Sequence, residues 1–173
     1  MQPHKIFETP FWHLKEELPH GAYEWALEYE KNNIGRTRSN YGGYQSDAFS
    51  MEDHPFKYHI NKCISFLPEN DFTGGWLNIN RNTDYNICHD HPGSDLTFIW
   101  FITDNDGNLK IRNPHSFSRS KLYQKFTGDI VGGISPKCTA GDMLLFPSDV
   151  LHAVSPTYKP EPRISISSNI ILK

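Results

Sequence analysis

Residues Leu96–Ile102, with the sequence LTFIWFI, form an unbroken apolar run that predicts a buried strand. Shorter segments around it also carry strand signals, and both Trp76–Asn80 and Asn108–Arg112 alternate apolar with polar residues. Three further strands are expected over Gly128–Ile134, Met143–Phe146 and Arg163–Leu172. Because clusters of Gly, Pro, Asn and Asp separate these segments, the pattern is typical of a β-sandwich or jelly roll.

The first seventy residues have a different character. Three prolines within residues 1–20 indicate an extended lead-in with a short strand around Ile6–Phe11. Apolar residues at helical spacing predict an amphipathic helix over about 20–32 and a second over Pro55–Leu67. The polar, Gly-rich segment Arg36–Asp53 is expected to be a loop or an edge hairpin. A chain of 173 residues suits one domain, with this helical and extended part over 1–70 and a β core over 71–173.

Composition narrows the class of partner. The net charge of −3 and the pI near 6.3 predict no basic face for nucleic acid. The chain has no apolar run of the roughly 20 residues that a membrane span needs, and its N-terminus lacks the apolar core of a signal peptide. Its three cysteines are an odd number without CxxC spacing, so a reducing cytoplasm is the expected compartment.

Two histidines lie one residue apart in the segment Cys88-His89-Asp90-His91-Pro92. On an extended segment, alternate side chains point to the same face, so His89 and His91 are expected to lie together. A third histidine, His152, could complete a facial three-ligand metal site with open positions. The pair alone is a weak motif among nine histidines, but its place at a predicted strand end, where functional sites are common, strengthens it.

Arg163 lies on the small-residue face of a predicted strand, beside Ser165 and Ser167. A guanidinium there can bind a carboxylate through two parallel hydrogen bonds, and a serine hydroxyl can add a third. The alternative is a surface arginine that makes a modest ion pair. Combined with the histidines, the arginine indicates a carboxylate anchor next to a metal.

A set of motifs follows in a fixed order along the chain: Trp76-Leu77-Asn78-Ile79-Asn80, His89-x-His91-Pro92-Gly93-Ser94, Gly107-x-Leu109 to Asn113-Pro114, Gly141-Asp142 to Phe146-Pro147-Ser148, His152, and Arg163-Ile164-Ser165-Ile166-Ser167-x-Asn169. Taken together in this order, the motifs resemble those of the 2-oxoglutarate-Fe(II) oxygenases found in bacteria and phages. The resemblance covers about the last hundred residues, and the N-terminal Ile6–Phe11 also resembles the family's opening strand.

The resemblance implies a mainly β (α+β) fold, a double-stranded β-helix jelly roll with one or two N-terminal helices packed outside. It also implies iron ligands at His89 and His152. His91 stands where the superfamily usually has a carboxylate, and Asp95 could supply a carboxylate instead.

Cosubstrate residues follow from the same resemblance. Arg163 and Ser165 match an Arg-x-Ser pair that binds the distal carboxylate of 2-oxoglutarate. Asn78 and Asn80 match a pair that contacts this cosubstrate in related oxygenases. Phe98 stands where the family usually has glycine, so the pocket or its neighbouring packing is expected to differ.

The implied activity is that of an Fe(II)- and 2-oxoglutarate-dependent dioxygenase that consumes O2 and releases succinate and CO2. Hydroxylation is the default outcome, with desaturation and halogenation left open. The expected substrate is a peptidyl side chain or a small metabolite, and the acidic charge balance disfavours nucleic acid. No membrane partner is expected, and a homodimer is left open. The segments Arg36–Asp53 and Pro114–Thr127 are the expected substrate-facing loops.

Two alternatives to an oxygenase remain, a cupin and a non-catalytic jelly-roll protein. A cupin would use His89, His91, Asp95 and His152 as its metal ligands, in an enzyme or a plain binding module. A cupin has no need of an arginine anchor beside the metal, so Arg163 discriminates between the two. The third class is a non-catalytic jelly-roll partner in which the histidines are incidental.

Overall fold

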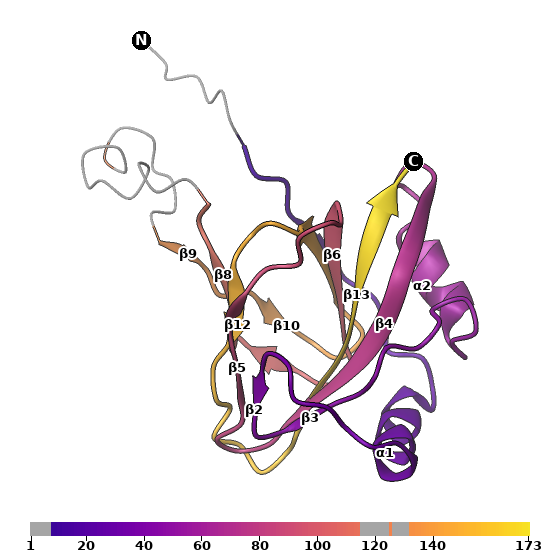
Figure 1. Cartoon of the computed structure of the whole chain (residues 1–173), viewed down its shortest axis with the longest axis vertical. Coiled ribbons are helices and arrows are strands. Elements are labelled where there is room, and N and C mark those ends of the chain that lie inside the picture. Colours follow the sequence, from indigo (N-terminus) through magenta and orange to yellow (C-terminus); the bar gives the residue numbers. More distant parts are fainter. Residues whose placement is uncertain (1–7, 115–124, 126–131) are drawn as a thin grey trace.

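The computed structural model describes residues 8–114, 125 and 132–173, and it consists of antiparallel sheets with two helices (Figure 1). The larger sheet has the order β1-β11-β6-β13-β4-β3. Its strands are β1 (Trp12–Leu14), β11 (Met143–Pro147), β6 (Leu96–Phe101), β13 (Arg163–Leu172), β4 (Asn70–Asn80) and β3 (Tyr44–Gln45).

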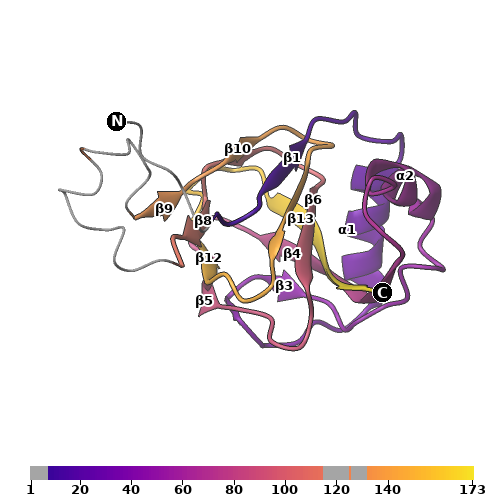
Figure 2. The same ribbon diagram turned by 90° about the horizontal axis from the view of Figure 1, so that it is seen from above.

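The smaller sheet has the order β2-β5-β12-β8-β9 and faces the larger one (Figure 2). Its strands are β2 (Asn40–Tyr41), β5 (Tyr85–His89), β12 (His152–Val154), β8 (Leu109–Arg112) and β9 (Gly133–Ile134). A two-stranded ribbon is formed by β7 (Asn105–Asp106) and β10 (Lys137–Cys138). The helices α1 (Ala22–Asn32) and α2 (Lys57–Cys63) lie on the side of the larger sheet that faces away from the smaller one (Figures 1 and 2). This arrangement confirms the prediction of a mainly β fold with helices packed outside.

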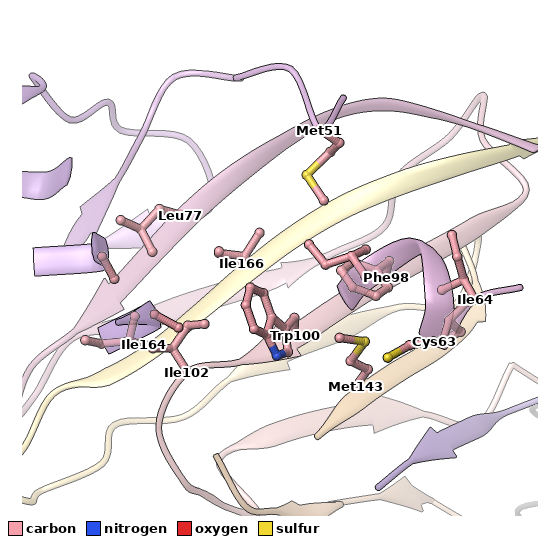
Figure 3. Packing of buried hydrophobic residues seen from close by; sticks show 14 of the residues in the cluster. Met51, Cys63, Ile64, Leu77, Phe98, Trp100, Ile102, Met143, Ile164 and Ile166 are labelled. Atoms are coloured by element: carbon pink, nitrogen blue, oxygen red, sulfur yellow. The ribbon is translucent and has the colours of Figure 1, made fainter. Parts of the chain in front are cut away.

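The apolar run of β6 is unbroken because its two faces enter two different cores. Phe98 and Trp100 point toward the helices, where they join a core with Ile64 and Met143 (Figure 3). Ile99 and Phe101 point the other way, into a second core between the two sheets. All four side chains are at most 4% exposed. Burying each is worth about 1.5–3 kcal/mol, so both layers depend on this strand.

Several predicted boundaries differ from the structure. The first described strand is Trp12–Leu14, residues 8–11 are not in a strand, and residues 1–7 lie outside the described part. The second helix covers only Lys57–Cys63 of the predicted Pro55–Leu67. Strand β4 begins at Asn70 and continues through two glycines, where a β-bulge interrupts its pairing with β13.

The segment Arg36–Asp53 is not a hairpin. Strand β2 pairs with β5 of the smaller sheet and β3 pairs with β4 of the larger one, so the segment crosses from one sheet to the other. The crossing turns at Gly42 and Gly43, whose φ angles are +67° and +60°. A Cβ on Gly43 would lie 2.9 Å from the carbonyl oxygen of Ile79. A larger residue would therefore push the crossing segment away from β4.

In the part of the chain that the structure describes, no helix is long and apolar enough to cross a membrane.

Candidate metal centre

Three histidines meet at one end of the space between the sheets. His89 ends β5 and His152 begins β12, and the two residues are direct partners across these strands. His91 lies just beyond β5, where its backbone N–H donates to the carbonyl of Ser148 at 2.8 Å. Ligand atoms of the three rings all lie within 4.8 Å of one another. The predicted pair and the distant third histidine are therefore brought together, as a facial metal site requires.

In two of the three rings, a hydrogen bond fixes which nitrogen is free. His89 Nδ1 lies 2.7 Å from the carbonyl oxygen of Ile87, and His152 Nδ1 lies 3.0 Å from that of Val150. Since a carbonyl only accepts, each Nδ1 carries the proton and donates, which leaves the Nε2 lone pair for a metal. Nε2 of His91 lies 3.3 Å from Nε2 of His152, so these two nitrogens converge.

Burial keeps two of these rings uncharged. Desolvation, with a smaller contribution from His89, lowers the pKa of His91 to about 4. Desolvation likewise lowers the pKa of His152 to about 4. Neutral imidazole is the form that binds metals, so both rings are ready ligands at neutral pH.

Asp95 lies outside this histidine cluster. Its side chain is exposed, and Oδ2 accepts a 2.8 Å hydrogen bond from the backbone N–H of Leu172 at the end of β13. The carboxylate thus has a structural role of its own. Among the described residues, the geometry favours His91 over Asp95 as the third ligand.

A cavity between the sheets connects the histidines with Arg163. The cavity is narrow, with a volume of about 30 Å³. The described lining residues come from both sheets and from the crossing segment: Ser39, Trp76, Asn78, Asn86, His89, His91, Thr97, Ile99, Leu109, His152, Val154, Arg163, Ser165 and Ser167.

Arg163 is a buried cation without an acidic partner among the described residues. Its side chain is held by Asn105, whose Oδ1 accepts from Nε at 2.9 Å, and by Ser165, whose Oγ accepts from Nη1 at 3.3 Å. The guanidinium also lies over the Phe101 ring, 5.4 Å from its centre. The residue is 4% exposed, and burial lowers its pKa to about 10. The alternative of a surface arginine is therefore wrong, and the site calls for an anion.

The two asparagines of β4 occupy different places. Asn78 lines the cavity and donates to Ser167 Oγ at 3.2 Å. Asn80 is not among the lining residues and donates to Oδ1 of Asn86 at 3.1 Å. Asn86 in turn donates to Ser39 Oγ at 3.2 Å and lines the cavity itself. Asn80 thus supports a neighbour that faces the cavity.

Sequence reasoning did not identify Asn86 or Asn105. Strict alternation places Asn86 on the face opposite His89, but a bulge sets two residues of β5, Ile87 and Cys88, against one of β12, so both side chains point inward. Asn105 is fully buried in β7 and positions Arg163 from outside the main sheets. Phe98 points into the helix-facing core against Phe72, so its size alters that packing and leaves the cavity unchanged.

A second group of potential ligand atoms consists of His13, Cys138 and Asp142. The acceptor in this group is already engaged, because the buried Asp142 carboxylate accepts from His13 Nε2 at 2.9 Å, from the Thr139 N–H at 3.0 Å and from Lys15 Nζ at 3.2 Å. Burial raises the pKa of the Cys138 thiol to about 12, so it stays protonated. The predicted loop Pro114–Thr127 falls almost entirely outside the described residues.

Several solved structures share the fold of this chain. The carbocyclase SnoK from nogalamycin biosynthesis, described as non-heme and alpha-ketoglutarate dependent, has a TM-score of 0.65 at 14% identity, covering 95% of this chain and 80% of its own. A prolyl-4-hydroxylase from Pseudomonas putida has a TM-score of 0.64 at 12% identity, covering 94% and 92%. HygX from Streptomyces hygroscopicus, solved with nickel, 2-oxoglutarate and hygromycin B, has a TM-score of 0.61 at 9% identity, covering 95% and 84%. At these identities the likeness shows the fold, and it confirms the predicted jelly roll.

Family membership rests on the sequence itself. No curated protein sequence matches the chain significantly. The model of the family described as "Putative 2OG-Fe(II) oxygenase" matches residues 74–169, which is more than half of the chain and spans β4 through most of β13. Fe(II) and 2-oxoglutarate are the cofactor and cosubstrate of this family. The chain therefore belongs to the 2-oxoglutarate-Fe(II) oxygenases.

Proposed function

We propose that the protein is a dioxygenase that hydroxylates a peptidyl side chain or a small metabolite at the His89, His91 and His152 centre. One observation carries the proposal: a buried guanidinium without an acidic partner in the described chain shares a cavity with three converging imidazoles. A metal at the histidines and a carboxylate at Arg163 would each satisfy one end of this cavity. Oxidising a C–H bond to C–OH balances against conversion of 2-oxoglutarate and O2 to succinate and CO2.

The proposed ligand set is His89, His91 and His152. Bound Fe(II), with 2-oxoglutarate and O2, supplies the oxidising power of the reaction. The chain's own task is to hold the Nε2 atoms of His89 and His152 in place through the carbonyls of Ile87 and Val150, with Nε2 of His91 converging on them.

Cosubstrate binding falls to the opposite end of the cavity. Arg163 would bind the distal carboxylate of 2-oxoglutarate, with Ser165 adding a hydroxyl and Asn105 fixing the direction of the guanidinium. Asn78 offers a further polar group along the cavity wall. The apolar residues Ile99, Leu109 and Val154 keep bulk water away from the space between metal and anchor.

Hydroxylation is proposed as the default outcome, and unlike halogenation it needs no halide at the metal. Structural neighbours include a prolyl-4-hydroxylase, a carbocyclase and an epimerase, so the fold alone does not select the outcome. The cupin alternative needs Asp95 at the metal, and this carboxylate instead accepts from the Leu172 backbone. No observation favours the cupin over the oxygenase.

The test begins with an anaerobic calorimetric titration, in which Fe(II) and then 2-oxoglutarate are added to the protein. One metal and one 2-oxoglutarate per chain are expected, with 2-oxoglutarate binding dependent on the metal. Under air, a panel of peptides and metabolites is then screened for succinate release. Absence of stoichiometric metal binding, or of metal-dependent 2-oxoglutarate binding, would contradict the proposal.

A further inference from the structure

A second, wider cleft opens in front of the histidines. Its volume is about 480 Å³, within the usual range of small-molecule sites. It shares Ser39, Trp76, His89 and His91 with the inner cavity, so a molecule held in it would lie against the proposed metal ligands. The crossing segment predicted to face substrate contributes several lining residues, among them Arg38, Gln45 and Ala48.

The described lining of this cleft carries positive charge and no negative charge. Apart from the histidines, Arg38 is the one charged side chain among its described lining residues, and no carboxylate lines it there. Arg38 forms no ion pair within the described residues, whereas Arg36, two positions earlier, pairs with Asp47. A free guanidinium at the edge of a cleft favours an anionic group on whatever binds there.

Two side-chain oxygens in the cleft also lack partners. The amide oxygens of Gln45 and Asn169 are buried without a hydrogen bond in the described structure. Gln45 is 6% exposed, so water has little access to its amide. A buried acceptor without a partner costs free energy that an N–H or O–H donor on a bound molecule would recover. Both residues line the same cleft as Arg38.

From these contacts we infer that the substrate carries a carboxylate, bound by Arg38, and beside it an N–H or O–H group that donates to the side-chain oxygens of Gln45 and Asn169. The inference rests on the proposed function, because it places that carboxylate in front of the same metal site. A single guanidinium matches a singly charged carboxylate through two parallel hydrogen bonds. Trp76 and the exposed Ile87 give the cleft an apolar side for the rest of the molecule.

The probes are N-acetyl-L-amino acids and the matching N-acetyl-L-amino-acid amides, which differ only in the carboxylate. Calorimetry on the Zn(II)-loaded, 2-oxoglutarate-bound protein measures binding without turnover, and succinate release measures turnover with Fe(II). We expect the preferred acid to bind about tenfold more tightly than its amide. A tenfold preference is modest because Arg38 is exposed, so water and salt screen its charge.

The decisive variant is Arg38→Gln, with Arg36→Gln as the matched control that removes the same charge from the same segment. Arg38→Gln should abolish the preference for acids, and Arg36→Gln should keep it. Equal binding of acids and amides, binding of no acid in the panel, an intact preference in Arg38→Gln, or stronger binding of phosphate monoesters would each overturn the inference. Failure of the proposed function would show separately, as loss of 2-oxoglutarate binding to the native metal-loaded protein.

Discussion

Replacing Arg163 by Met should affect cosubstrate binding and protein stability in opposite directions. The guanidinium is buried without a described counter-ion, so the free protein already bears its desolvation cost. Methionine keeps an unbranched apolar side chain and removes the charge. The variant loses the hydrogen bonds to Asn105 and Ser165, but Asn105 Oδ1 still accepts from the Leu109 N–H. We therefore expect the free energy of unfolding of the apo protein to stay within about 1 kcal/mol or to rise.

Binding of 2-oxoglutarate should weaken strongly in the same variant. Two charge-assisted hydrogen bonds to a carboxylate are worth about 1.5–3 kcal/mol each, so losing them costs about 3 kcal/mol or more. That loss raises the dissociation constant of 2-oxoglutarate by more than about 100-fold. Arg81→Met is the control, because Arg81 pairs with Glu30 and does not line the cavity.

The assay combines urea unfolding of the apo protein with calorimetric titration of the Zn(II)-loaded protein by 2-oxoglutarate. A variant that unfolds more easily by several kcal/mol yet binds 2-oxoglutarate as the native protein does would refute the reasoning. In that case Arg163 would be a structural residue, and the anchor would lie elsewhere.

Three further outcomes are expected. His91→Ala should lower Zn(II) affinity at least about 100-fold in a competition assay, whereas Asp95→Ala should keep native affinity and lose about 1 kcal/mol of stability with its backbone hydrogen bond. Asn105→Ala should weaken 2-oxoglutarate binding about tenfold in calorimetry, because Arg163 loses its main positioning contact. Burial lowers the pKa of His54 from 6.5 to about 4, so only the unfolded chain takes up this proton between these values. The contribution of His54 to the free energy of unfolding is then fully present above pH 6.5 and falls by about 3 kcal/mol toward pH 4. In the His54→Phe variant, urea unfolding measured at a series of pH values should show a loss of stability toward pH 4 that is smaller by this amount.

The β core could be predicted well because its strands have apolar runs or alternate apolar with polar residues. The run Leu96–Ile102 needs two apolar environments, and the structure provides one on each side of β6. Boundaries near the N-terminus were predicted less well. Whether Arg36–Asp53 forms a hairpin depends on which sheet each short strand joins, and two-residue strands carry no pattern that decides this.

For the candidate site, the sequence predicted that the three histidines lie together, as they do in the structure, but it did not predict the surroundings of the other side chains. Histidine spacing indicated a metal centre, but the burial of Arg163 depends on packing by Phe101 and Asn105, which lie far from it in sequence. The serines around Arg163 carried the useful signal. Small side chains at Ser165 and Ser167 leave room on the inner face of β13, while Ile164 and Ile166 fill the outer core.

Asn86 shows where alternation along a strand stops being a sufficient guide. The bulge in β5 adds one residue between Asn86 and His89, and that extra residue turns both side chains toward the cavity. Without the bulge, either the asparagine or the histidine would face solvent, because successive residues of a regular strand point to opposite faces. The register of His89 against His152 holds the two proposed metal ligands together, so the irregularity is confined to the stretch before the histidine. The same stretch carries the carbonyl of Ile87 that accepts from His89 Nδ1. A local break in strand geometry thus orients the first proposed ligand and brings a polar neighbour to the cavity between the sheets.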